Sequence, residues 1–257
     1  MNKKLSIIIM IIVLLLGIVL FFLVKNNHKD KDKEQKNNNY SLVLNNYSVW
    51  EYNKAWYKSN IDRVNNKTMS VYIDKAVLGD YTLVYGSTWN LFDANKNYVN
   101  YEGDLVAISP NKKLYFINYK KESLDNSDLS TIRELSGIDY LSIQKISPFE
   151  KVVCDLDNNG VEDSIIIASN KDIQNQIRYF NIAYGNLNGQ VNTLLNKEIS
   201  ADKKKAEPSY SLNNVLLFEK DTYGSIVLHK TYFSESGKPG SLMFGFDGKK
   251  YQLLIED

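Results

Sequence analysis

The sequence predicts a mostly-β domain, antiparallel and meander- or sandwich-like with minor helix, behind one N-terminal transmembrane helix. Three observations lead to this fold class. A run of residues near the N-terminus is apolar and uncharged. After it, short β-branched and aromatic stretches alternate with turn residues, and the 18 Tyr suit a pleated, half-buried surface. The 257 residues are 44% hydrophobic and 24% charged, which excludes a wholly disordered or collagen-like chain.

The apolar run extends from Leu5 to Val24. A helix rises about 1.5 Å per residue, so this segment spans about 30 Å, the thickness of a bilayer's hydrocarbon core. A cleaved secretory signal usually has an apolar region of about 7–15 residues and a small-residue cleavage site. Here Lys25 and two Asn follow the run. We therefore expect an uncleaved anchor over 5–24, and the alternative is a cleaved signal.

Basic residues flank the anchor on both sides. Lys3 and Lys4 in the head, residues 1–4, favour a cytoplasmic N-terminus, whereas the Lys residues of 25–39, counted alone, favour the reverse. Acidic residues alternate with the downstream Lys residues. We therefore expect the N-terminus on the inner side of the cell membrane and the C-terminal domain outside the cell. The stem, residues 25–39, has no apolar residue and predicts a flexible charged tether in which His28 is solvated.

From residue 40 to 257 we expect the mostly-β extracytoplasmic domain, with a candidate boundary between two lobes near Ile146, marked by Pro148. No repeat of fixed period is present, which argues against a propeller. The expected strands are Ser70–Asp74, Tyr81–Tyr85, Asp104–Ile108, Leu114–Tyr119, Ser164–Ala168, Arg178–Tyr184, Val215–Phe218, Ile226–Phe233, Ser241–Phe246 and Tyr251–Ile255.

Turn and helix signals separate these strands. Pro presets a turn backbone, and Asn-Gly or Asp-Gly supplies the positive φ angles of tight hairpins. The expected hairpin turns are Ser109-Pro110-Asn111, Asn188-Gly189 and Asp247-Gly248. The best helix runs from Asp128 to Leu135, with Ser127 as its cap and Gly137 as its stop. The segment from Val49 to Ile61 fits either helix or strand.

Composition excludes several classes of site. The single cysteine, Cys154, excludes an intrachain disulfide and a multi-cysteine zinc site. Two histidines leave little material for a His-based centre. The net charge is +1, divided into +4 over residues 1–39 and −3 over the rest, and it argues against binding nucleic acid through a basic face. No G-x-S-x-G, H-E-x-x-H or phosphate-binding glycine motif occurs.

One segment, residues 151–170, carries the pattern D-x-D-x-N-G-x-x-D. Oxygen-bearing side chains at positions 1, 3, 5 and 9, with Gly at 6, suit a loop that wraps a hard cation. Ca²⁺ takes six to eight oxygens at about 2.3–2.6 Å. We therefore expect a calcium site whose ligands are Asp155, Asp157, Asn159, Val161 (through its carbonyl) and Asp163. Asn159-Gly160 alone would also suit a polar hairpin turn without an ion, which is the alternative interpretation.

An EF-hand requires Glu at position 12 of this loop, where the chain has Ile166, and helices on both sides, where the chain has strand-like runs. The EF-hand and dockerin interpretations are thereby excluded. The loop instead resembles the calcium loop of FG-GAP and VCBS-type repeats, found in integrin-like propellers and many bacterial surface proteins. The resemblance covers residues 151–170 alone and implies the same five ligands. The family usually has Asp where Asn159 stands, which implies weaker binding, and its propeller fold is not implied.

Other residues with potential chemistry favour structural roles. Cys154 has no basic neighbour and is expected to be a small buried residue rather than a reactive thiol. His229 lies in an alternating strand. An ordinary turn is expected over Asp93, Asn95 and Asn97. Aromatic side chains that could stack on sugars are expected to belong to the core, namely Trp50, Tyr52, Trp56 and Tyr57.

Together these features predict a membrane-anchored extracytoplasmic binding or accessory module with a structural calcium loop. Abundant Asn, Lys, Ile and Tyr favour an AT-rich genome and a bacterial cell envelope, where the partner would be an envelope protein or a wall polymer. The lack of a recognisable nucleophile–base pair argues against an enzyme. The alternative is an anchored hydrolase acting on cell-wall glycan or peptide, with Glu162 and Asp163 in a cleft beside Trp50 or Trp56.

The topology is tested with Asn38→Cys in the stem. A membrane-impermeant maleimide should label this variant on intact cells, because the stem is expected outside. The wild-type chain is the control, since Cys154 is expected to be buried. Labelling that appears only after lysis would reverse the orientation, and a mature chain that begins near residue 25 would establish a cleaved signal.

Overall fold

A computed structural model describes residues 39–45, 48–110, 112–139, 141–146, 149–171, 178–200, 208–219, 221–232 and 239–257. The predicted head, the anchor over 5–24 and all of the stem except Asn39 lie outside the described residues, and so does Pro148. Within the described ranges no helix is both long enough and apolar enough to cross a membrane. The lobe boundary near Ile146 stays a prediction.

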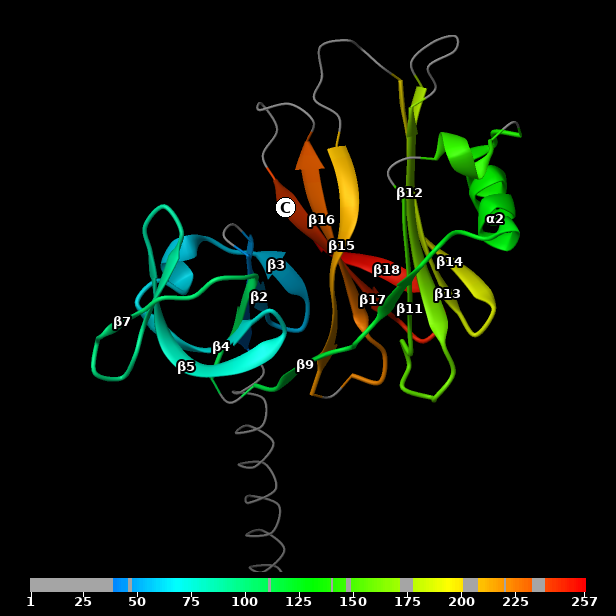
Figure 1. Ribbon diagram of the computed structural model, residues 1–257. Coiled ribbons are helices and arrows are strands. Elements are labelled where there is room, and N and C mark those ends of the chain that lie inside the picture. Colours follow the sequence, from blue (N-terminus) through cyan, green and yellow to red (C-terminus); the bar gives the residue numbers. More distant parts are fainter. Residues whose placement is uncertain are drawn as a thin grey trace, which may run out of the picture. The chain divides into compact units, whose positions relative to one another are not determined.

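The chain divides into two compact units, Met1–Tyr40 with Tyr52–Lys54, and Ser41–Glu51 with Ala55–Asp257. In the first unit, the rings of Tyr40 and Tyr52 lie 5.1 Å apart. The strands and the helix described below belong, apart from Tyr40 and Tyr52, to the second. The expected mostly-β structure with minor helix is confirmed by three antiparallel sheets and one α-helix, α2 (Asn126–Ser136), among the described residues (Figure 1).

The first sheet has eight strands and its own core, in which Trp89, Leu83 and Leu91 are almost fully buried. Val49 to Ile61, which fitted either helix or strand, forms two short strands and is followed by a 3-10 helix at Ile61–Arg63. In order across the sheet, the strands are β3 (Trp56–Lys58), β2 (Ser48–Tyr52), β1 (Tyr40–Leu44), β8 (Leu105–Ile108), β4 (Lys67–Ile73), β5 (Ala76–Tyr85), β6 (Trp89–Phe92) and β7 (Tyr98–Val99).

Two five-stranded sheets follow. The strands of the second sheet, in spatial order, are β10 (Lys120–Glu122), β11 (Phe149–Cys154), β12 (Asp163–Lys171), β13 (Arg178–Leu187) and β14 (Gln190–Ser200). Those of the third are β18 (Tyr251–Glu256), β17 (Gly240–Phe246), β16 (Ser225–Tyr232), β15 (Pro208–Phe218) and β9 (Leu114–Phe116). A second 3-10 helix lies at Ile143–Lys145.

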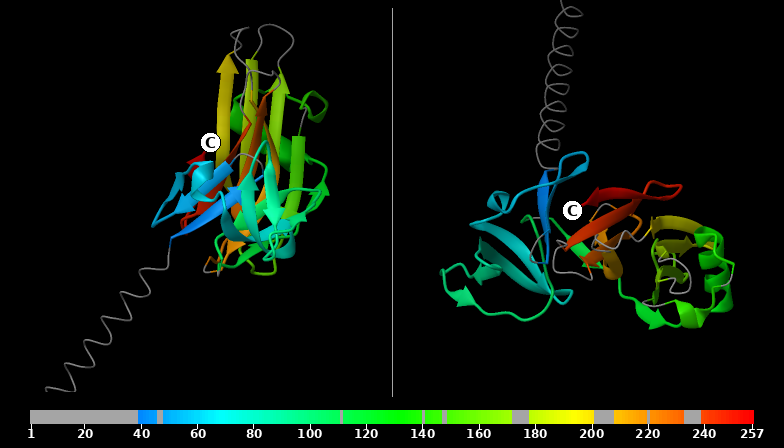
Figure 2. Two further views of the ribbon diagram at one scale, coloured as in Figure 1. Left: turned by 90° about the vertical axis from the view of Figure 1, so that its left-hand side faces the viewer. Right: turned by 90° about the horizontal axis from the view of Figure 1, so that it is seen from above.

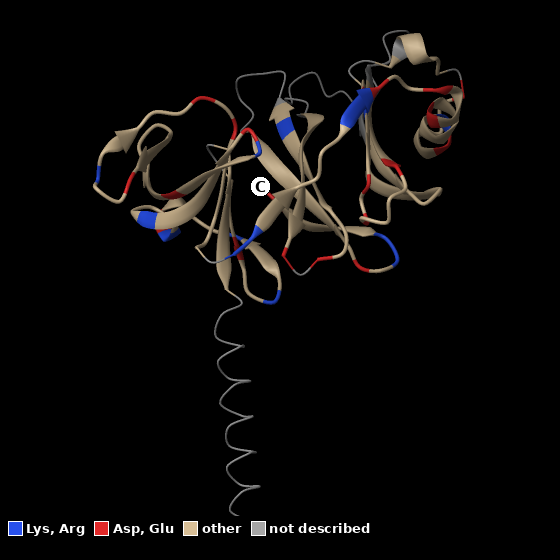
Figure 3. Cartoon of the chain, turned by 60° about the horizontal axis from the view of Figure 1, so that its bottom comes forward, with Lys and Arg blue, Asp and Glu red and all other residues tan. Residues whose placement is uncertain are grey.

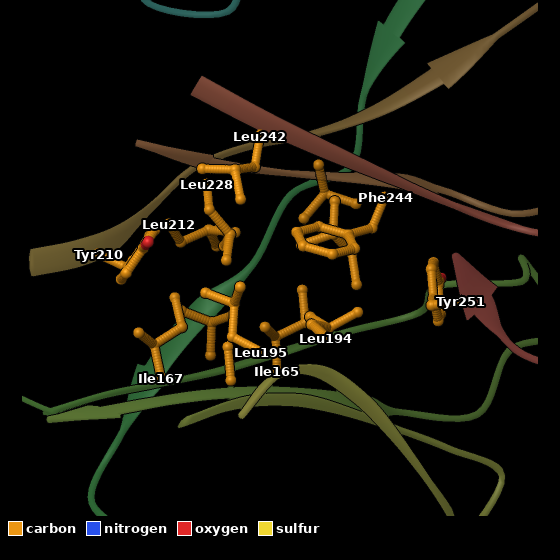
Figure 4. Close-up of a cluster of buried hydrophobic side chains, with 14 of the residues drawn as sticks. Ile165, Ile167, Leu194, Leu195, Tyr210, Leu212, Leu228, Leu242, Phe244 and Tyr251 are labelled. Atoms are coloured by element: carbon orange, nitrogen blue, oxygen red, sulfur yellow. The ribbon is translucent and has the colours of Figure 1, made fainter. Parts of the chain in front are cut away.

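The second and third sheets pack face to face as a sandwich. Their shared core contains Ile165 and Ile167 from β12 and Leu228 and Phe244 from the facing sheet (Figure 4). The alternate residues of β12, Ile166 and Ala168, point to the opposite face and pack beneath α2. Figure 2 accordingly shows α2 and the strands β15–β18 on opposite sides of the second sheet. Burial on both faces explains why the middle of β12, residues 165–168, is continuously apolar instead of alternating.

Helix α2 is held at its N-terminus by Asp125. The Asp125 carboxylate accepts the N–H groups of Ser127 and Asp128, and the Asp128 carboxylate accepts the N–H of Asp125, which completes a capping box. The prediction that Ser127 caps the helix was therefore wrong, because the helix begins two residues earlier than the apolar pattern indicated. Gly137, with φ of 69°, ends it as expected.

A buried ion pair fastens α2 to the second sheet. The Lys151 ammonium on β11 lies 2.7 Å from the Asp128 carboxylate and 3.0 Å from that of Asp125. Lys151 is 9% exposed and Asp128 is 8% exposed. Burial is the largest single influence on the pKa of Lys151 and acts to lower it, but the hydrogen bonds to Asp128 and Asp125 outweigh burial and raise it.

Two of the three expected hairpin turns join paired strands. Asn188-Gly189 links β13 to β14, and the turn at Asp247-Gly248 links β17 to β18, although it has four residues because Phe246 pairs with Tyr251. At Ser109-Pro110 the chain does turn, and the N–H of Lys112 donates to the Ser109 carbonyl. The strands on its two sides enter different sheets, so the expected hairpin there was wrong. A turn signal specifies a local reversal and not the strand that pairs next.

The ion pair beneath α2 is tested with Lys151→Met. Removing the cation leaves the buried Asp128 carboxylate without an opposite charge beside it, so we expect a loss of about 3 kcal/mol in the free energy of unfolding, measured by urea denaturation of the full chain in detergent. Adding Asp128→Leu should recover much of that loss. Lys120→Met, which removes an exposed ammonium, is the control and should change little. Equal losses in both single variants would contradict the assignment.

Candidate metal centre

The predicted calcium loop joins β11 to β12 and closes where Cys154 pairs with Asp163. One carboxylate oxygen from each of Asp155, Asp157 and Asp163 lies within 4.8 Å of the others. The three acids of the pattern are therefore gathered at one point. Figure 3 shows that acidic and basic positions are otherwise interspersed along the described chain in that view.

Asp155 shapes the first half of the loop. Its carboxylate accepts the N–H of Asn159 at 3.0 Å and the N–H of Gly160 at 2.8 Å. Asn158 and Gly160 have φ of 56° and 83°, the left-handed region that Asn and Gly adopt most readily. Burial acts to raise the pKa of Asp155 and is the largest single influence, but the backbone hydrogen bonds together outweigh it and lower this pKa.

Asp163 is the buried member of the group, at 3% exposure. Its two oxygens accept the N–H groups of Leu156 and Asn188, each at 2.9 Å. Burial raises the pKa of Asp163, the two N–H donors oppose the rise, and the nearby Asp157 and Asp155 add to it. The folded chain thus holds this proton more tightly than the unfolded chain, so ionisation of Asp163 as the pH rises lowers the free energy of unfolding. A bound cation would offset that loss.

Asn188 is a member of the site that the sequence prediction missed. It lies in the β13–β14 turn, and its amide nitrogen donates to the Asp157 carboxylate at 2.9 Å. Its amide oxygen accepts a hydrogen bond from the Asn159 side chain at 3.0 Å. In an antiparallel meander every second turn falls at the same end of the sheet, so the Asn188-Gly189 turn signal would have placed this residue beside the loop once the order of the strands was known.

Asn159 and Val161 complete the five predicted ligand residues. The Asn159 side chain donates to Asp157 at 3.0 Å and accepts the N–H of Val161 at 2.7 Å. The Val161 side chain points to solvent and is 55% exposed. The donors gathered here are carboxylate and amide oxygens, with no sulfur or imidazole, and such a set suits Ca²⁺ better than zinc or copper.

The remaining single-residue expectations are mostly confirmed. Cys154 is 5% exposed, and burial, with smaller contributions from Asp163 and Asp155, raises the pKa of its thiol to about 12. His229 lies in β16 with its pKa lowered mainly by burial. Asp93 accepts the N–H groups of Asn95 and Asn97, as an ordinary turn requires.

The aromatic residues that were expected in the core differ in their burial. Trp50 is fully buried, and the rings of Trp56 and Phe218 lie 5.3 Å apart. Tyr57 does not belong to the core: it is 46% exposed, and its hydroxyl donates to Glu51. Strand β3 has only three residues and forms the edge of its sheet, which explains this exposure.

The two acids of the alternative hydrolase interpretation, Glu162 and Asp163, have other interaction partners. Glu162 is exposed and forms an ion pair with Lys120 at 2.9 Å. Both Asp163 oxygens accept backbone N–H groups, as described above. Trp50 and Trp56 belong to β2 and β3 of the first sheet, whereas Asp163 begins β12 of the second.

Neither a protein-family model, nor a curated protein, nor a solved structure matches this chain.

Proposed function

We propose that the chain is a membrane-anchored extracytoplasmic binding module of a bacterial cell envelope, in which a calcium ion stiffens the end of the β-sandwich. The observation that carries the proposal is the convergence of the Asp155, Asp157 and Asp163 carboxylates on a loop with the D-x-D-x-N-G-x-x-D pattern. Like charges gathered this closely repel each other, and a divalent cation removes the repulsion.

A structural role for the ion follows from what surrounds it. The carboxylates also accept backbone N–H groups from Leu156, Asn159, Gly160 and Asn188, so the site is built into two adjacent turns. Catalytic metals keep a coordination position open for water or substrate. Here the cation would join the β11–β12 loop to the β13–β14 turn and hold two hairpins in register.

Attachment to the membrane rests on the apolar run from Leu5 to Val24 and on the charged stem that follows. A fully extended stem over 25–39 reaches at most about 50 Å, which keeps the module close to the bilayer. A tether of this kind suits a protein that engages an envelope protein or the wall polymer nearest to the membrane.

Calcium binding is tested by thermal unfolding of the full chain in detergent. At a hundredfold excess over Kd, calcium should stabilise the fold by about 2.7 kcal/mol, or roughly 5–10 °C in Tm. Asp157→Ala should abolish the increment while leaving a folded chain, because Asp157 is only partly buried, unlike Asp163. Asp93→Ala, in the turn without the full pattern, is the matched control and should keep it. If millimolar calcium leaves the Tm of the wild-type chain unchanged, the loop is a polar turn without a calcium site.

The binding role is tested by sedimentation with purified cell walls. The full chain in detergent should co-sediment with the walls and release no soluble sugar or peptide. Release of product by the wild-type chain that is lost in Glu162→Gln, with the Tm unchanged, would instead establish the hydrolase.

A further inference from the structure

A groove of about 410 Å³ opens at one end of the sandwich, between β10–β12 of the second sheet and β15–β16 of the third. Its volume falls in the usual range of small-ligand sites. Ile167 and Tyr210 line it and are 4% and 5% exposed. Figure 4 shows both side chains at the same end of the inter-sheet core, away from Tyr251.

Glu150 is the central polar group of this groove. It alternates along β11 with residues that face α2, and it therefore points between the sheets. One of its oxygens forms an ion pair with Lys121 at 2.8 Å. The other accepts the N–H of Leu212 at 2.8 Å, where a register shift interrupts the β15–β16 ladder. Each carboxylate oxygen has two lone pairs, so Glu150 can accept further hydrogen bonds from a ligand.

The charges that line the groove are balanced within the protein. Lys121 is paired with Glu150, Lys151 with Asp125 and Asp128, and Glu122 with Lys120 at 3.3 Å. A strongly charged ligand would have to break one of these pairs. The groove thus favours an uncharged ligand with hydrogen-bond donors.

The other lining groups are three hydroxyls and an accessible ring. Ser209, Ser211 and Thr231 supply the hydroxyls, and the Phe149 ring is 41% exposed. Hydroxyls and a carboxylate that accept hydrogen bonds, beside an aromatic ring against which C–H groups can pack, match the alternating polar and apolar surface of a sugar ring.

An extended peptide fits less well. Strands β12 and β16 are paired on both sides, and β10, the edge strand, has only three residues. Strand β15 pairs with β9 only over Leu216–Phe218, and its open edge is interrupted where the Leu212 N–H donates to Glu150. A peptide that adds a strand needs a longer unpaired edge. Recognition must therefore proceed through side chains. We propose that this groove binds an uncharged oligosaccharide, an inference that rests on the proposed function and names the class of wall polymer recognised.

The probe is tetra-N-acetylchitotetraose, an uncharged amino-sugar oligomer, titrated calorimetrically into the full chain in detergent. Wild type should bind it saturably, and Phe149→Ala and Glu150→Gln should each weaken binding tenfold or more. Tyr115→Ala removes a ring that is 50% exposed on β9, outside the groove, and is the matched control. Thr231→Val is a second test: it removes the hydroxyl of an exposed lining residue, spares the Glu150 hydrogen bonds, and should also weaken binding.

Absence of saturable sugar binding, equal affinity in all variants, or saturable binding of acetyl-tetraalanine amide in place of the sugar would each overturn the inference. The wall-sedimentation assay keeps the two proposals apart. If wild type and Phe149→Ala sediment equally well with walls, the proposal that the groove binds the wall sugar is overturned, whereas the proposed binding module is supported. Wild type that binds the tetramer but no wall would support the groove and overturn the proposed partner.

Discussion

Burial of the second sheet on both faces is the constraint that orders this molecule. Ile165 and Ile167 face the third sheet while Ile166 and Ala168 face α2, so the middle of β12 has no solvated side on which polar groups could lie. Apart from the Lys151 ion pair beneath α2, the candidate polar sites consequently lie at the ends of the strands. Strand β11 has a candidate site at each end: it begins at Phe149 and Glu150, which line the groove, and it ends at the acidic loop. The candidate metal and ligand sites therefore lie at opposite ends of one buried strand.

Features whose signals are local could be predicted. The strand runs, the Asn188-Gly189 turn and the acidic loop each depend on residues that are neighbours in sequence, and the structure contains all three. The burial of Cys154 follows in the same way, because it alternates in step with Val152 on the core face of β11. In each case backbone preference and side-chain pattern agree within about ten residues.

Features that depend on distant pairing escaped prediction. The Asp125 cap was missed because an apolar pattern marks the buried face of a helix and not its first turn. The role of Asn188 requires knowing that two turns meet at one end of a sheet. The groove requires the packing of two sheets, and Glu150 reads in the sequence as an ordinary surface acid although it accepts a hydrogen bond from a residue 62 positions away.

The edge strand β9 has a consequence for how the chain folds. Phe116 pairs with Leu216, one hundred residues later, so the third sheet acquires this strand only by closing a very long loop. Contacts of such high sequence separation bring an entropic penalty before any stabilising burial, and they slow folding. If the domain is translocated across a membrane in order from its N-terminal end, β9 reaches the far side well before β15 and stays unpaired until β15 follows. Its brevity, three residues, limits the aggregation hazard of that interval.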